Sequence, residues 1–222
     1  MRPYEPDRLL VSVHIPKCAG TSLAAWLRTA FHGRLHLHYP DAEPPERTPG
    51  GAGWCVHGHF YHHAWPIGVR DVYPEARQFI TVLRDPLEMM VSSYFFQVAM
   101  GDRPADTLTA WLEDVLTWPC LFPYLGLPVD LRDPDLVDRL AEDLVWIGTV
   151  ERLGSGLPVL ARRLGVACPP LPRSNAALRS ERLADPERWR ERMRDRFPAE
   201  HRLYDFAVTT AEQEAAQMAG ES

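Results

Sequence analysis

The chain has 222 residues, of which 45% are hydrophobic, and its formal net charge is −6 at pH 7. This length is sufficient for one sizeable core, so we expect a single domain over residues 1–222, with a peripheral tail from about residue 209. The negative charge argues against nucleic acid as the natural partner, and the polar start and strand-length apolar runs argue against a signal peptide or a membrane span.

The first predicted unit is a strand, a loop and a helix. Residues 9–13 form an apolar run of strand length, and apolar residues at helical spacing run from residue 22 to residue 31. The loop between them reads His14-Ile15-Pro16-Lys17-Cys18-Ala19-Gly20-Thr21-Ser22. Because a helix N-terminus presents unbonded N–H groups and the positive end of the helix dipole, this loop predicts an anion site.

Lys17 is the only lysine of the chain: the 24 lysine and arginine residues, less this one, leave 23 arginines. An ammonium group is a compact point charge that suits a single phosphate or leaving-group oxygen, whereas a guanidinium suits a planar, bidentate partner. Lys17 precedes Gly20, unlike the lysine of the nucleotide loop G-x-x-x-x-G-K-[ST]. We predict that Lys17 contacts an anion; a solvated surface lysine is the structural alternative.

Residues 57–63 hold four of the nine histidines. In Val56-His57-Gly58-His59-Phe60, the alternation of an extended segment places His57 and His59 on one face. Three interpretations are open. This face could bind zinc, although no cysteine pair or carboxylate at ligand spacing accompanies it; the rings could be partly buried structural residues; or a neutral imidazole could take the proton of a hydroxyl group.

A second strand, loop and helix follow. The apolar run Gln78–Leu83 ends in Arg84-Asp85-Pro86, where Asp85 is a suitable N-cap and Pro86 fits the first helical position. The predicted inward face of the helix consists of Leu87, Met90, Val91, Tyr94 and Val98. An arginine paired with a carboxylate is the structural alternative to an anion site at Arg84.

The rest of the chain continues the alternation of strands and helices. Helices are predicted over residues 105–116, 134–144, 156–164, 186–196 and 210–218. The arginine-rich segment 173–196 is either a polyanion-binding cluster or a solvated helix with i, i+4 ion pairs. The pattern predicts a three-layer α/β domain with a central, mostly parallel sheet and a ligand at the carboxyl ends of its strands.

The loop at residues 14–22 resembles the 5′-phosphosulfate loop of the PAPS-dependent sulfotransferases. PAPS is 3′-phosphoadenosine 5′-phosphosulfate. The resemblance is to the carbohydrate type (family 2), which includes heparan sulfate 2-O-sulfotransferase and in which the loop usually reads H-I-P-K-T-A-G-T-S. Residues 84–94 resemble the 3′-phosphate motif R-D-P-x-x-R-x-x-S-x-Y. Segments 145–152 and 201–207 resemble a strand followed by a Glu-Arg pair and the D-x-x-L-Y-x-x-A segment. Cys18 replaces a threonine and Met89 the second arginine.

The resemblance implies a P-loop-like sulfotransferase fold, PAPS as cofactor, adenosine 3′,5′-bisphosphate as product and no metal. His59 is then the general base with His57 as helper, and Lys17 stabilises charge on the bridging oxygen. The implied cofactor-binding residues are Lys17, Cys18, Ala19, Gly20, Thr21, Ser22, Arg84 and Ser92.

The acceptor implied by the resemblance is a hydroxyl group of a carbohydrate or a small molecule. A small nucleotide-dependent kinase is one alternative, although it should supply Mg²⁺ ligands and a Gly-Lys-Ser/Thr sequence; a non-catalytic PAPS-binding module is another. Four widely spaced cysteines, with no Cys-x-x-Cys pair, predict reduced thiols in a cytoplasmic protein. The Golgi members of the family are membrane-anchored, so the resemblance, together with the preference for arginine over lysine, implies a soluble member of bacterial type.

Overall fold

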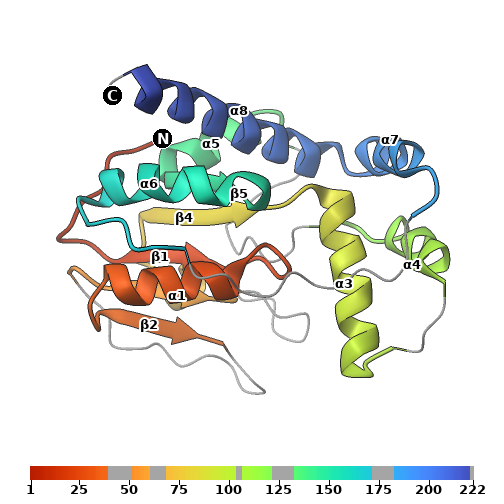
Figure 1. Cartoon of the computed structure of the whole chain (residues 1–222), viewed down its shortest axis with the longest axis horizontal. Helices are drawn as coiled ribbons and strands as arrows, with labels where there is room; N and C mark the ends of the chain where they lie inside the picture. Colours follow the sequence, from red (N-terminus) through yellow and green to blue (C-terminus); the bar gives the residue numbers. More distant parts are fainter. Residues whose placement is uncertain (40–51, 61–68, 104–106, 122–132, 172–182, 221–222) are drawn as a thin grey trace.

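The computed structural model describes residues 1–39, 52–60, 69–103, 107–121, 133–171 and 183–220. Within these ranges five parallel strands form one sheet in the order β2-β3-β1-β4-β5. The strands are β1 (Leu10–Val13), β2 (Leu35–His38), β3 (Cys55–Gly58), β4 (Gln78–Leu83) and β5 (Leu144–Thr149). The prediction of a parallel α/β sheet with helices on both faces is confirmed (Figure 1).

Helices lie between β1 and β2, between β3 and β4 and between β4 and β5, and further helices follow β5. They are α1 (Gly20–Ala30), α2 (Val69–Val72), α3 (Pro86–Met100), α4 (Leu108–Val115), α5 (Leu136–Asp143), α6 (Leu153–Leu164), α7 (Pro186–Arg196) and α8 (Pro198–Gly220), with a 3₁₀ turn, η2, at Val150–Arg152. The predicted start of α3 is confirmed, because the Asp85 carboxylate accepts a hydrogen bond from the Glu88 N–H at 2.9 Å and Pro86 is the first helical residue.

Two hydrophobic cores cover the two faces of the sheet. On one face α1 and α6 pack against the strands, with Trp26 and Trp146 almost completely buried. Glycine is required beside Trp146, because a Cβ atom at Gly148 would lie 2.2 Å from the indole ring. The second core takes in residues of α3, α4, α5, α7 and α8. Strands buried on both faces explain why the sequence shows continuous apolar runs rather than alternation.

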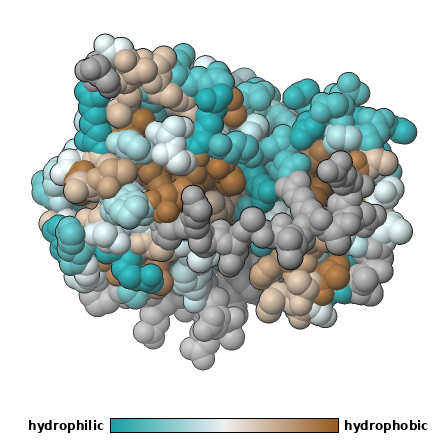
Figure 2. Space-filling view, in the orientation of Figure 1, coloured by the Kyte–Doolittle hydropathy of each residue, from teal (hydrophilic) through white to brown (hydrophobic). Residues whose placement is uncertain are grey.

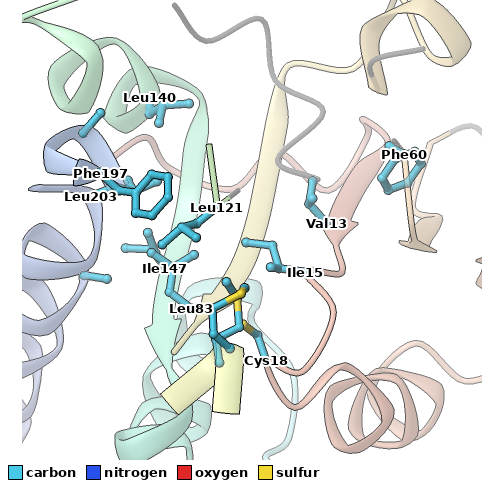
Figure 3. Packing of buried hydrophobic residues seen from close by; sticks show 14 of the residues in the cluster. Val13, Ile15, Cys18, Phe60, Leu83, Leu121, Leu140, Ile147, Phe197 and Leu203 are labelled. Atoms are coloured by element: carbon cyan, nitrogen blue, oxygen red, sulfur yellow. The ribbon is translucent and has the colours of Figure 1, made fainter. Parts of the chain in front are cut away.

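The second core also holds the loop between β1 and α1. Ile15 and Cys18 are each 1% exposed and lie beside Leu83 at the end of β4 (Figure 3). These two buried side chains anchor the loop, so its remaining residues are held against the carboxyl edge of the sheet.

The register brings three strand ends together at that edge. Val13 pairs with Gly58, and Gly58 pairs with His38. The next residue of each chain segment therefore leaves the sheet at the same level, so that His14, Tyr39 and His59 become neighbours. This is the edge at which parallel α/β sheets bind ligands.

The C-terminal helix differs from the prediction. The sequence pattern gave a helix over residues 210–218, whereas α8 begins at Pro198 and runs for 23 residues along β5 and α6 (Figure 1). Thr210 and Glu214, in the segment expected to be a peripheral tail, are buried, and an oxygen of Glu214 accepts a hydrogen bond from Arg163 of α6 at 2.6 Å. None of the described helices combines the length and the apolar character needed to cross a membrane.

Candidate active site

The loop that follows β1 has an unusual backbone. Lys17 and Ala19 have φ angles of 64° and 58°, in the left-handed region that residues other than glycine seldom adopt. The N–H of Cys18 donates a hydrogen bond to the carbonyl of Ile15 at 3.2 Å, which closes the turn. Backbone strain at two positions of one short loop is a feature that clusters at ligand sites.

The N-terminus of α1 lies directly after this loop. The first helical hydrogen bond runs from the Leu23 N–H to the Ala19 carbonyl at 3.0 Å. Among the described side chains none caps α1, and its first turn contains no acidic residue. The positive end of the helix dipole therefore lies at Gly20, Thr21 and Ser22, and binding of an anion there stays a prediction.

The side chain of Arg84 contacts Lys17 in the loop after β1. The Nη1 group of Arg84 donates a hydrogen bond to the carbonyl oxygen of Lys17 at 3.3 Å. The Lys17 ammonium lies 4.0 Å from the centroid of the Phe96 ring on α3. Burial, and then the neighbouring Arg84 guanidinium, lower the pKa of Lys17. Two cations held side by side favour the binding of an anion between them.

A second arginine approaches from α7. Arg190 lies 3.3 Å from a carboxylate oxygen of Asp85 and 3.8 Å from one of Glu88, and Arg84 lies 3.7 Å from the other oxygen of Glu88. Met89, which occupies the position of the family's second arginine, is buried in the core. The sequence placed Arg190 in the arginine-rich segment 173–196 but did not show that it lies near Arg84, because the two are about a hundred residues apart in the chain. Ser92, one turn further along α3, is 9% exposed.

The other arginines of α7 belong to the surface. Arg192 forms a bidentate ion pair with Glu113 of α4, at 2.6 and 2.7 Å, and Arg196 donates to the carbonyls of Leu116 and Trp118. Figure 2 shows a hydrophilic surface over α7. These arginines tie α7 to α4, and the part of the arginine-rich segment before residue 183 lies outside the described residues.

Three histidines and a tyrosine form a cluster on the other side of the loop. The ring centroid of His14 is 4.5 Å from that of His59 and 5.3 Å from that of His57. The Tyr39 ring lies edge-on to all three imidazoles, and its hydroxyl is 3.0 Å from Nδ1 of His14. The sequence indicated His57 and His59 but missed His14 and Tyr39. His62 and His63 lie outside the described residues.

Burial distinguishes the histidines from one another. His57 has no exposed surface, and its Nδ1 is 2.8 Å from the buried hydroxyl of Ser12. Burial, and then His59, lower the pKa of His57 to about 4, whereas burial lowers that of the less buried His59. The pKa of His14 falls to about 2 through burial and the proximity of His59, His57 and Lys17. All three rings are neutral near pH 7.

The two motifs near the C-terminus also meet at this edge. Glu151 in η2 accepts a hydrogen bond from the Asp85 N–H at 3.2 Å and another from the Tyr204 hydroxyl of α8. Burial, and then the Glu151 carboxylate, raise the pKa of Tyr204. Glu151 thus links α8 to the start of α3 as a hydrogen-bonding residue.

The described His, Cys, Asp and Glu side chains include no group of three or more that is arranged to hold a metal ion. The expectation that no metal takes part stays a prediction.

No protein-family model and no curated relative matches the chain. Among solved structures, it is similar to a sulfotransferase from Alicyclobacillus acidocaldarius, with a TM-score of 0.53, 16% identity and coverage of 92% of this chain and 96% of that chain. The fold is that of a sulfotransferase. The mouse sulfotransferase SULT7A1 complexed with PAP aligns with a TM-score of 0.45 and 15% identity, over 86% of this chain and 63% of that one.

Proposed function

We propose that the protein is a PAPS-dependent sulfotransferase that transfers a sulfuryl group to an acceptor hydroxyl. One observation carries the proposal: at the carboxyl edge of a sulfotransferase-type sheet, the loop at residues 14–22 joins a pair of cations to a cluster of neutral imidazoles. An anionic donor and a proton acceptor are the two requirements of this chemistry. The acceptor class is a carbohydrate or small molecule with a free hydroxyl group.

The residues present fit the donor. The uncapped start of α1 suits the 5′-phosphosulfate, and Lys17 lies beside it. Arg84 and Ser92, on the neighbouring unit, are the proposed contacts of the 3′-phosphate. When bound, PAPS supplies an activated sulfuryl group. Lys17 would stabilise the charge that develops on the bridging oxygen, because an ammonium close to a leaving oxygen binds the transition state better than the ground state.

His59 is the favoured general base. His57 is completely buried and bonded to Ser12, and its low pKa makes it a weak proton acceptor on Brønsted grounds. His59 is less buried and is directly attached to the end of β3. In the proposed step the acceptor oxygen bonds to sulfur, the bond from sulfur to the bridging oxygen breaks, and the hydroxyl proton passes to His59.

Calorimetric titration tests the donor assignment. Adenosine 3′,5′-bisphosphate should bind, adenosine 5′-monophosphate should bind more weakly, and ATP with Mg²⁺ should bind more weakly than the bisphosphate. Tighter binding of ATP with Mg²⁺ would replace the sulfotransferase by the kinase alternative. Bisphosphate binding without PAPS consumption across a panel of phenols, alcohols and sugars would favour the non-catalytic module.

A further inference from the structure

His14 and Tyr39 come from two strands that are not neighbours in the sheet. His14 directly follows β1 and Tyr39 directly follows β2, and β3, which leads into His59, lies between them. Despite this separation, the Tyr39 hydroxyl reaches Nδ1 of His14 at 3.0 Å. Both rings of this hydrogen-bonded pair lie close to the ring of His59, with centroid separations of 4.5 Å for His14 and 5.0 Å for Tyr39.

The His14 ring is enclosed on its other side by the start of α1. A Cβ atom added at Gly20 would lie 1.9 Å from both Cδ2 and Nε2 of His14, so the ring occupies the space that any other residue at position 20 would need. The backbone is equally fixed, because the His14 N–H donates to the carbonyl of Gly58 at 2.8 Å. The His14 ring thus lies between Gly20, at the start of α1, and the ring of His59.

The protonation states in this cluster are defined by their surroundings. Burial raises the pKa of Tyr39 to about 12, so its hydroxyl keeps its proton. The titratable groups that face His14 are Tyr39, His57, His59 and Lys17, and their proximity together with burial keeps His14 neutral. A neutral imidazole carries one proton, so the hydrogen bond runs from the Tyr39 hydroxyl to Nδ1 in one tautomer of His14 and from Nδ1 to the hydroxyl in the other; in both, it fixes the ring.

We infer that Tyr39 and His14 form a positioning pair that holds His59 against the phosphate loop. The inference rests on the proposed function. The Tyr39 hydroxyl fixes the orientation of the His14 ring, and this ring supports His59 and shields one side of it from water. His14 is a positioning residue and His59 the proton acceptor.

The chain contains a matched control for this pair. The Tyr73 hydroxyl lies 3.4 Å from Nδ1 of His38 at the end of β2, so it offers the same two chemical groups outside the cluster of His14. Tyr39 is 38% exposed and Tyr73 is completely buried. Replacement of Tyr39 by phenylalanine should therefore disturb the packing less than the same replacement at Tyr73.

The experiment compares Tyr39→Phe, Tyr73→Phe and His14→Ala. Tyr39→Phe should lower kcat about five- to tenfold, the size of one net hydrogen bond, with the Kd for the bisphosphate unchanged. Tyr73→Phe should leave kcat unchanged. In His14→Ala, water reaches the side of His59 that the ring covered, so the pKa of His59, followed by NMR of its imidazole protons, should rise towards the ordinary value. A kcat of Tyr39→Phe equal to that of the wild type would overturn the inference.

The imidazole titration distinguishes a failure of the positioning pair from a failure of the proposed function. If the wild type binds no bisphosphate and consumes no PAPS, the proposed function fails, but the NMR titration of His59 in His14→Ala still decides whether His14 shields it. An unchanged His59 pKa in that variant would refute the positioning pair even in an active sulfotransferase. Should His14→Ala not fold, the NMR comparison of Tyr39→Phe with the wild type serves instead: unchanged His59 resonances would equally refute the pair.

Discussion

The carbonyl oxygen of Lys17 accepts a hydrogen bond from Nη1 of Arg84, so the side chain of one candidate ligand residue supports the backbone of the other. This contact joins the loop after β1 to the end of β4. The guanidinium of Arg84 therefore holds the loop after β1 in place, and its role as an anion ligand stays a prediction.

Replacement of Arg84 by alanine should weaken binding of the bisphosphate by about 10- to 100-fold, because a hydrogen bond to a charged group contributes roughly 1.5–3 kcal/mol. Calorimetry should show a smaller loss for adenosine 5′-monophosphate, which lacks the 3′-phosphate. Arg192→Ala is the matched control, since that guanidinium pairs with Glu113 on the surface. Equal losses in both variants would assign the effect to overall charge.

Lys17→Met should separate stability from activity. The lowered pKa of Lys17 means that the folded state disfavours its charge, so removal of that charge should raise rather than lower the melting temperature at pH 7. Turnover at saturating PAPS should fall more than bisphosphate affinity, because the charge on the leaving oxygen develops towards the transition state. A lower melting temperature with unchanged turnover would contradict both expectations.

Replacement of the two histidines of the His-Gly-His segment should have different effects, one on turnover and the other on stability. His59→Ala should lose about 10²–10⁴ in kcat, the usual range for a general base, and retain most of its stability. His57→Ala should lose stability instead, by roughly 1–3 kcal/mol, because it leaves the buried Ser12 hydroxyl without its partner. Denaturant unfolding and steady-state kinetics distinguish the two. Activity that EDTA abolishes and zinc restores would make the cluster a metal site.

Gly20→Ala tests the contact between α1 and His14. The added methyl group would lie 1.9 Å from the ring, so His14 must move and both the melting temperature and kcat should fall. Gly154→Ala is the control: it also lies in the first turn of a helix, where an added Cβ meets nothing within 4 Å. That variant should be neutral or more stable, by up to about 1 kcal/mol. A fully active Gly20→Ala enzyme would show that the position of His14 is unimportant.

The free energy of unfolding should decrease as the pH falls through the range in which the unfolded chain binds protons that the folded chain does not bind. His57 has a folded pKa of about 4 against an ordinary value of 6.5, so its contribution is complete above pH 6.5 and is lost as the pH falls to about 4. Urea unfolding at several pH values measures this slope. His57→Asn should flatten it, and an unchanged slope would show that the ring is protonated in the fold.

The elements with strong local signals were predicted from sequence. Continuous apolar runs indicated β1 and β4, an Asp-Pro cap fixed the start of α3, and the predicted range of α7 matches the observed one. The edge strand β2 was missed, since its Leu-His-Leu-His sequence is short and partly exposed. The early start of α8 depends on its packing over β5 and α6, which no local pattern records.

The residues of the candidate site also divide into those that belong to a local sequence motif and those that only the fold brings together. Lys17 and Arg84 were named as candidates from sequence because each belongs to a short motif at the end of a strand, and their roles as ligands stay predictions. The contacts of His14 with His59 and Tyr39 depend on the strand order β2-β3-β1, which brings three separate segments to one level. Arg190 reaches Glu88 only through the packing of α7 on α3. Contacts between segments that are far apart in the sequence cannot be predicted from the spacing of residues within a motif.

The single lysine side chain of the chain is a site that can be labelled selectively. Lys17 is the only side chain with a primary amine among the 222 residues, so an amine-selective acylating reagent can modify a single side-chain amine. Because the pKa of Lys17 is lowered, a larger fraction of it is the nucleophilic free base than in an ordinary lysine. A single mass increment on the peptide that contains Lys17, and its suppression by a bound anion, would therefore report occupancy of this loop directly, without any assay of turnover.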